Sequence, residues 1–124
     1  MSDSAENATY EELAAAMRRA GRVLVAGHLR PDGDAIGSQL ALALALARLG
    51  KQVSVWNHDP IPDKLRFLPG AEMMSRPPRD RKHDFDLAIA VDTSSRERLG
   101  DTLEAVGEVG QWQNIDHHAT NERY

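Results

Sequence analysis

Acidic and imidazole side chains gather in three short motifs whose residue types suit metal binding. The first runs His28-x-x-x-Asp32-x-Asp34, the second is Asp92, and the third is the triplet Asp116-His117-His118. Imidazole combined with carboxylate suits Mn, Fe, Zn or Co, whereas purely oxygen sites suit Mg and Ca. Two carboxylates separated by one residue, with glycine beside them, can form a tight loop around cations. The motifs therefore indicate a centre that binds divalent cations and, through them, an anionic substrate.

Each motif also has a plainer interpretation when taken alone. The sequence Pro31-Asp32-Gly33-Asp34 is a common turn. A histidine such as His28 after a strand can be a hydrogen-bonded structural residue. Asp92 could instead cap a helix that begins at Ser94 or Ser95. Adjacent histidines also occur in solvated loops. Only the placement of the motifs relative to the predicted strands can distinguish a metal site from these plainer interpretations.

Helical and extended patterns alternate along the chain. The pattern predicts helices over Tyr10–Ala20, with Thr9 as cap and Gly21 as stop, over Ile36–Leu49 ending at Gly50, and in short form over Asp63–Phe67 and Leu103–Glu108. It predicts strands over Val23–Ala26, Gln52–Asn57, Leu87–Val91 and, more weakly, Trp112–Ile115. Strands and helices at this spacing predict an α/β fold, a parallel sheet flanked by helices.

The motifs follow the predicted strands. His28 comes shortly after Val23–Ala26, Asp92 directly after Leu87–Val91, and Asp116 directly after Trp112–Ile115. Ligands of open parallel sheets bind beyond the carboxyl ends of the strands. Scattered surface charges would not be expected to fall there, so the shared placement favours one common site over the separate plainer interpretations.

The predicted helix Ile36–Leu49 begins just after the first motif, so its free amide groups and dipole can face an anion. Arg30 could hold a phosphate or simply lie on the loop surface. His58, in a Pro-flanked loop, and His83, in a charged stretch, are expected to face solvent. Neither of these two is assigned to the site.

The composition is that of an ordinary globular domain. The 124 residues carry a net charge of -4, which argues against broad, non-specific nucleic-acid binding but leaves a nucleotide substrate open. The absence of cysteine excludes disulfides and thiolate metal sites. The acidic N-terminus has no secretory signal pattern, and the most apolar run, Leu40–Leu49, is too short to span a bilayer. A cytoplasmic protein without membrane attachment is expected, with residues 1–9 as a polar tail and 10–124 as the domain.

The three ordered motifs resemble those of the DHH phosphoesterase superfamily, which is named for a triplet like Asp116-His117-His118. Its first motif looks like His28-x-x-x-Asp32-x-Asp34 and its second like Val91-Asp92-Thr93-Ser94. The first motif and the stretch Asp63–Gly70 are most similar to the NrnA-type oligoribonucleases. Those enzymes also act as phosphatases on 3′-phosphoadenosine 5′-phosphate. The resemblance covers nearly all of residues 10–121 and implies a Rossmann-like DHH domain.

Carried over residue by residue, the resemblance implies a centre of two Mn²⁺ ions, with Mg²⁺ or Co²⁺ as alternatives. His28 and Asp32 would hold one ion, Asp34 and His117 the other, and Asp92 would bridge them. His118 would face the substrate phosphate, with Arg30 as a further candidate contact, and Asp116 would orient its neighbours. Asp92 and His118 are thus the implied catalytic residues, and the reaction would be in-line hydrolysis at phosphorus.

The family normally has a further metal-binding Asp and a second, substrate-gripping domain, neither of which precedes Tyr124. The sequence is therefore expected to be the N-terminal part of a longer enzyme, inactive or weakly active alone, with short oligonucleotides or nucleotides as substrates and a homodimer as a compatible full-length form. Three alternatives stay open. One is a non-catalytic nucleotide- or metal-binding module, another is a metal-free interaction domain, and the third is another DHH activity, namely pyrophosphatase, single-strand exonuclease or cyclic dinucleotide phosphodiesterase.

Overall fold

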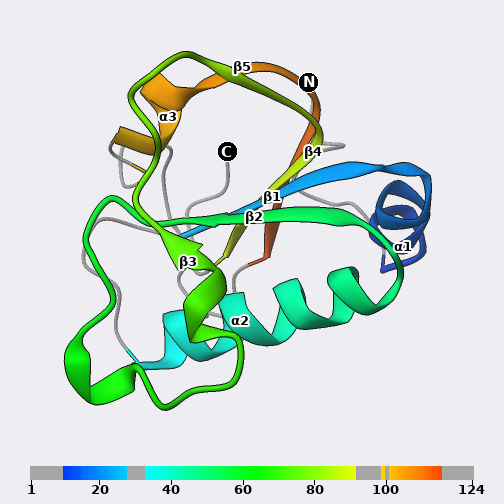
Figure 1. Cartoon of the computed structure of the whole chain (residues 1–124). Coiled ribbons are helices and arrows are strands. Elements are labelled where there is room, and N and C mark those ends of the chain that lie inside the picture. Colours follow the sequence, from blue (N-terminus) through cyan, green and yellow to red (C-terminus); the bar gives the residue numbers. More distant parts are fainter. Residues whose placement is uncertain (1–9, 28–32, 92–98, 100, 116–124) are drawn as a thin grey trace, which may run out of the picture.

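The computed structural model describes residues 10–27, 33–91, 99 and 101–115 (Figure 1). Within these ranges the chain forms a five-stranded sheet of order β3-β2-β1-β4-β5, and each pairing is parallel. The strands are β1 (Arg22–Ala26), β2 (Gln52–Trp56), β3 (Met74–Ser75), β4 (His83–Val91) and β5 (Val106–Ile115). The helices are α1 (Tyr10–Arg19), α2 (Gly33–Arg48) and α3 (Asp101–Ala105), with 3₁₀ turns η2 (Asp63–Leu65) and η3 (Ala71–Met73). The predicted α/β class with a parallel sheet is confirmed.

The central strands are apolar on both faces. Residues Val23 to Ala26 of β1 and Leu87 to Val91 of β4 are all buried. Such continuous apolar runs are typical of parallel strands covered on both sides, because each face needs a packed layer. The sheet therefore has a core above and below it.

Figure 1 shows the covering layers, with α2 below the sheet and α3 above it. On one face, Ala16 of α1 and Ala43 and Leu46 of α2 pack against Val23 and Val25. On the opposite face, residues of α3 and its surroundings join a second cluster, which comprises Leu24, Ala26, Trp56, Phe85, Ala88, Ala90, Leu99 and Ala105. The two layers fix the sheet between them.

Helix α2 carries one row of buried residues, of which Ala43 and Leu46 pack on the sheet and Ile36 and Leu40 pack with Ile61 in the segment after β2. Ile36, Leu40, Ala43 and Leu46 recur at helical spacing and are at most 2% exposed. Full burial of a Leu or Ile side chain contributes roughly 1.5–3 kcal/mol. The helix ends as predicted around Gly50, whose φ is +84°. Its N–H donates to the carbonyl of Ala47 at 3.0 Å, and the N–H of Lys51 donates to Leu46 at 3.2 Å, which is the Schellman pattern.

Several predicted boundaries were wrong. Helix α2 begins at Gly33 rather than Ile36, so Asp34 lies in its first turn. Strands β4 and β5 are longer than predicted and begin at His83 and Val106. The helix predicted over Leu103–Glu108 is α3, which starts and ends earlier, and β3 was not predicted at all.

Contacts between neighbouring strands explain the two long strands. The charged start of β4 is extended because its carboxylates accept backbone hydrogen bonds: Asp84 accepts the N–H of Glu108 at 2.7 Å. The glycines of β5 allow close packing against β4. A Cβ at Gly110 would lie 2.6 Å from the carbonyl oxygen of Asp86, and one at Gly107 would collide with the Asp84 carboxylate.

Candidate functional site

The carboxyl ends of the strands are level with one another. Ala26 at the end of β1 pairs with Trp56 of β2 and with Ala90 of β4. Val91, the last residue of β4, pairs with Ile115, the last residue of β5. The chain therefore leaves three adjacent strands at one edge of the sheet, which we call the carboxyl edge.

The predicted site residues come directly after these strand ends in the sequence. Most of them lie outside the described residues, namely His28, Arg30, Asp32, Asp92, Asp116, His117 and His118. Asp34 is described as part of the first turn of α2, but its side chain is not. The structure thus shows where the three segments start, and the arrangement of their side chains stays a prediction. Within the described part of the chain, no three His, Asp or Glu side chains form a cluster suited to a metal ion.

Two buried amide side chains lie at the carboxyl edge. Gln39 of α2 and Asn57, the residue after β2, are both 0% exposed. The Gln39 Nε2 donates to the carbonyl oxygens of Val25 at 3.2 Å and Trp56 at 3.3 Å. The Gln39 Oε1 and the Asn57 Oδ1 have no hydrogen-bond partner among the residues described. Burying a polar atom without a partner costs free energy, so these oxygens need an explanation.

Gly27 makes room for both amides. A Cβ added there would lie 2.6 Å from the Gln39 Oε1 and would also collide with the Asn57 Oδ1. Gly27 follows β1 directly, and its N–H donates to the carbonyl of Trp56 at 3.3 Å. The two oxygens therefore converge on the residue from which the chain enters the first motif.

The end of β5 carries a comparable group. The Oδ1 of Asn114, one residue before the end of the strand, is buried and has no hydrogen-bond partner within the described ranges. Its neighbour Ile115 leads into the third motif. Acceptor oxygens without a partner in the described part of the chain thus lie beside the starts of two of the three predicted segments. Such oxygens can accept the N–H of an imidazole or a bound water and so orient metal ligands.

Sequence reasoning did not identify these amides. One signal was present: Gln39 is a polar residue within the otherwise apolar row of α2 that faces the sheet. The polar atoms of a buried side chain in such a row either form hydrogen bonds with the backbone or serve a functional role. Among the described residues, Gln39 has partners for its Nε2 but none for its Oε1.

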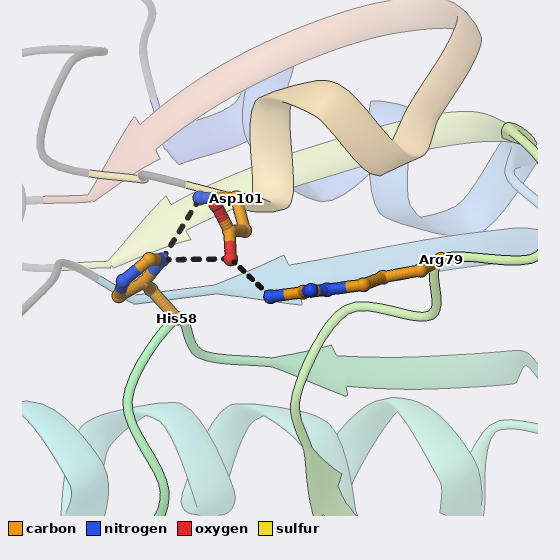
Figure 2. A network of polar contacts seen from close by, with 3 residues as sticks. All are labelled: His58, Arg79 and Asp101. Atoms are coloured by element: carbon orange, nitrogen blue, oxygen red, sulfur yellow. Dashed lines mark hydrogen bonds and ion pairs between the residues drawn. The ribbon is translucent and has the colours of Figure 1, made fainter.

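The prediction that His58 faces solvent was wrong. Its side chain is 30% exposed and lies against the start of α3, as Figure 2 shows. The Nδ1 atom accepts the backbone N–H of Asp101 at 3.1 Å and lies 3.3 Å from its Oδ2. An atom that accepts this N–H cannot also donate to the carboxylate, so the neutral ring carries its proton on Nε2. Arg79 Nη2 approaches the same carboxylate at 3.5 Å.

The same prediction was wrong for His83. Its side chain is 16% exposed, its Nε2 lies 3.2 Å from Asp80 Oδ1, and its ring meets Trp56 edge-on at 5.7 Å. The hydrogen bond with His83 lowers the pKa of the Asp80 carboxyl. His58 is held by a backbone N–H and His83 by a carboxylate, and neither contact could be inferred from the residues beside the two histidines in the sequence.

No helix within the described ranges is long and apolar enough to cross a bilayer.

Comparisons place these features among known proteins. The profile of the DHH family, N-terminal domain, matches residues 22–124. The bifunctional oligoribonuclease and PAP phosphatase NrnA of Thermus thermophilus is 43% identical over 105 residues, which are 84% of this chain and 30% of that protein. The crystal structure of an exopolyphosphatase-related protein from Bacteroides fragilis matches with a TM-score of 0.78 and 27% identity, covering 90% of this chain and 35% of the other. The chain thus spans about a third of the length of these relatives.

Proposed function

The chain belongs to the DHH family, N-terminal domain, and from this premise we propose that it carries most of the metal centre of a phosphoesterase. One observation supports this most directly. The carboxyl ends of β1, β4 and β5 are level, and each is followed in the sequence by one of the three motifs. In an open parallel sheet ligands bind at this edge, at the point where the strand order reverses, which here lies between β1 and β4.

The residues at this edge fit a pair of divalent cations. Imidazole and carboxylate donors suit Mn²⁺. The buried, unpaired oxygens of Gln39 and Asn57 supply acceptors that can orient ligands from behind. We assign His28 and Asp32 to one ion, Asp34 and His117 to the second, and Asp92 to both. When bound, the ions supply Lewis-acid stabilisation of the charge that develops on the phosphoryl group.

The remaining residues bind and orient the substrate. His118 donates a hydrogen bond to a phosphate oxygen, and Asp116 fixes the orientation of the neighbouring histidines by accepting an N–H. Arg30 is the additional phosphate contact. Helix α2 starts at Gly33, and because the first N–H groups of a helix have no acceptor within the helix, this end can also favour the phosphate anion of the substrate. The predicted roles of these side chains follow the family resemblance.

The substrate class we favour is short oligoribonucleotides together with 3′-phosphoadenosine 5′-phosphate. The support is the 43% identity to a protein named for both activities. Inorganic polyphosphate is the second candidate, because the solved relative at 27% identity is described as exopolyphosphatase-related. A cytoplasmic location and Mn²⁺ as the cellular metal belong to the same proposal.

Substitution of Asp92 tests the proposal. Asp92→Ala should reduce Mn²⁺-dependent hydrolysis by more than about 100-fold, the upper range for residues that only support a ligand. The assay uses short oligoribonucleotides, 3′-phosphoadenosine 5′-phosphate and polyphosphate in parallel. It is run on the chain alone and on any longer polypeptide that contains it.

The matched control is Asp86→Ala, which removes a carboxylate from β4, the strand that precedes Asp92 in the sequence, towards its amino end. This variant should keep its activity at a temperature where it is folded. Undiminished turnover by Asp92→Ala would contradict the assignment of Asp92 as a ligand of both metal ions. Tight binding of Mn²⁺ and nucleotide without hydrolysis of any substrate would favour the binding module instead.

A further inference from the structure

The side chain of Gln39 ties together two segments of the chain that border the first motif. Its Nε2 donates to the carbonyls of Val25 and Trp56, at 3.2 and 3.3 Å, near the carboxyl ends of β1 and β2. Both partners are carbonyl oxygens and can only accept, so the amide nitrogen must face them and Oε1 must point elsewhere. The orientation of the amide is thereby fixed by its partners.

The hydrogen bond between Gln39 and Val25 joins residues on either side of the first motif. Val25 lies two residues before Gly27, and Gln39 lies six residues after Gly33. The two hydrogen-bonded residues therefore flank residues 28–32, which include His28 and Asp32, and the helical turn that carries Asp34. Fixing both borders of a short segment lowers the number of conformations that the segment can sample before it binds an ion.

Gln39 is a poor choice for stability alone. It is 0% exposed, and its Oε1 has no partner within the described part of the chain. Its neighbours in the buried row of α2 are Ile36, Leu40 and Ala43. An apolar side chain of similar length would fit that row without burying an amide oxygen. The carbonyls of Val25 and Trp56 would lose the Gln39 donor, but the Trp56 carbonyl would still accept the Gly27 N–H at 3.3 Å, so the net cost should be small. A residue that costs stability at the border of a candidate site points to function.

We propose that Gln39 is a positioning residue that sets the conformation of the first motif for metal binding. The inference rests on the proposed function, because the ion is the ligand whose binding Gln39 would favour. Gly27 belongs to the same arrangement, since only a residue without Cβ leaves space for the Gln39 Oε1. Gln39 acts through the backbone of β1 and β2 and does not touch the ion or the substrate.

Two measurements on Gln39→Met test the inference, namely thermal melting without metal and calorimetric titration with Mn²⁺. Methionine keeps the length of the side chain and removes both N–H donors. We expect a melting temperature equal to or above that of the wild type and an Mn²⁺ affinity about 10- to 100-fold weaker, the range for residues that orient ligands. Gln39→Leu should behave in the same way and covers a failure of methionine to pack.

The control is Leu46→Ala, a buried position of the same helix near its other end. It should lower the melting temperature yet leave Mn²⁺ affinity unchanged at a temperature where the protein is folded. An Mn²⁺ affinity within twofold of wild type in both Gln39 variants would overturn the inference and leave the proposed function intact. A wild-type protein that binds no Mn²⁺ would overturn both.

Discussion

At the amino edge of the sheet, where β1 and β4 begin, exposed charges satisfy the backbone. The Asp86 carboxylate accepts the N–H groups of Gly21 and Arg22 at 2.8 and 2.9 Å, and Lys51 Nζ donates to the carbonyl of Arg18 at 2.7 Å. At the carboxyl edge the polar groups are buried, and the amide oxygens of Gln39 and Asn57 are without partners within the described ranges.

The difference separates stability from function. At the amino edge, Asp86 links β4 to the start of β1, and Lys51 links the turn before β2 to the end of α1. These groups have partners within the protein and need no ligand. Unpaired buried oxygens cost free energy, and proteins keep such groups mainly where they act on a ligand or its supports. This difference supports our proposal that the carboxyl edge, which the three motifs follow in the sequence, is the functional edge of the sheet.

The largest expected effect comes from filling a glycine at each edge. Gly27→Ala places a Cβ against the Gln39 and Asn57 oxygens, and Gly110→Ala places one 2.6 Å from the Asp86 carbonyl oxygen. Each should destabilise the fold by about 1–3 kcal/mol in denaturant unfolding. Only Gly27→Ala should also weaken Mn²⁺ binding. An equal loss of Mn²⁺ affinity in Gly110→Ala would contradict the claim that only the carboxyl edge takes part in metal binding.

A smaller effect is expected at the contact between β2 and α3 shown in Figure 2. His58→Ala removes the acceptor for the Asp101 N–H and should cost about 0.5–1.5 kcal/mol of unfolding free energy. Arg79→Ala removes a side chain that is 81% exposed and should cost less than about 0.5 kcal/mol. Urea titration of both variants checks the order. A larger cost for Arg79→Ala would show that the ion pair, not the backbone hydrogen bond, holds α3.

Gly37→Ala should stabilise the protein slightly, by up to about 1 kcal/mol, because alanine is the better helix former. A Cβ there meets nothing within 4 Å, although Gly37 lies only two residues before Gln39. Gly50→Ala is the opposite control, since its φ of +84° disfavours a side chain. Thermal melting distinguishes the two. Destabilisation by Gly37→Ala would mean that crowding near the carboxyl edge extends beyond Gly27.

The smallest expected effect concerns pH at the amino edge. Hydrogen bonds from the backbone N–H groups of Arg22 and Gly21 lower the pKa of the Asp86 carboxyl. Its contribution to stability is therefore present above the unfolded pKa, about 4, and is lost as pH falls through the folded value. Asp86→Asn cannot titrate, so its melting temperature should fall less than that of the wild type between about pH 6 and about pH 3. Identical falls would show that Asp86 has no part in acid sensitivity.

The fold class was predictable because it depends on apolar runs, and the proposed site follows from the residues directly after those runs. Val23–Ala26 and Leu87–Val91 are long enough to identify buried strands, and chain order alone puts the motifs at their carboxyl ends. The starts of β4 and β5 were not predictable in this way. They depend on Asp84 accepting the Glu108 N–H, a contact between residues 24 positions apart that local patterns do not encode.

The polar supports of the site escaped prediction for a related reason. Gln39 is visible in the sequence as one polar residue in an Ala- and Leu-rich helix, but its partners Val25 and Trp56 come from two other strands. His58 and His83 have polar neighbours in sequence and looked exposed, yet each is held against another element. Long-range packing decides burial at such positions.

The most direct test of a metal centre at the carboxyl edge is a crystal structure of the Mn²⁺-soaked protein with anomalous diffraction. We expect two manganese peaks beyond the ends of β1, β4 and β5, coordinated by His28, Asp32, Asp34, Asp92 and His117. Peaks at the amino edge, or none beyond these three strand ends at saturating Mn²⁺, would contradict a metal centre at the carboxyl edge.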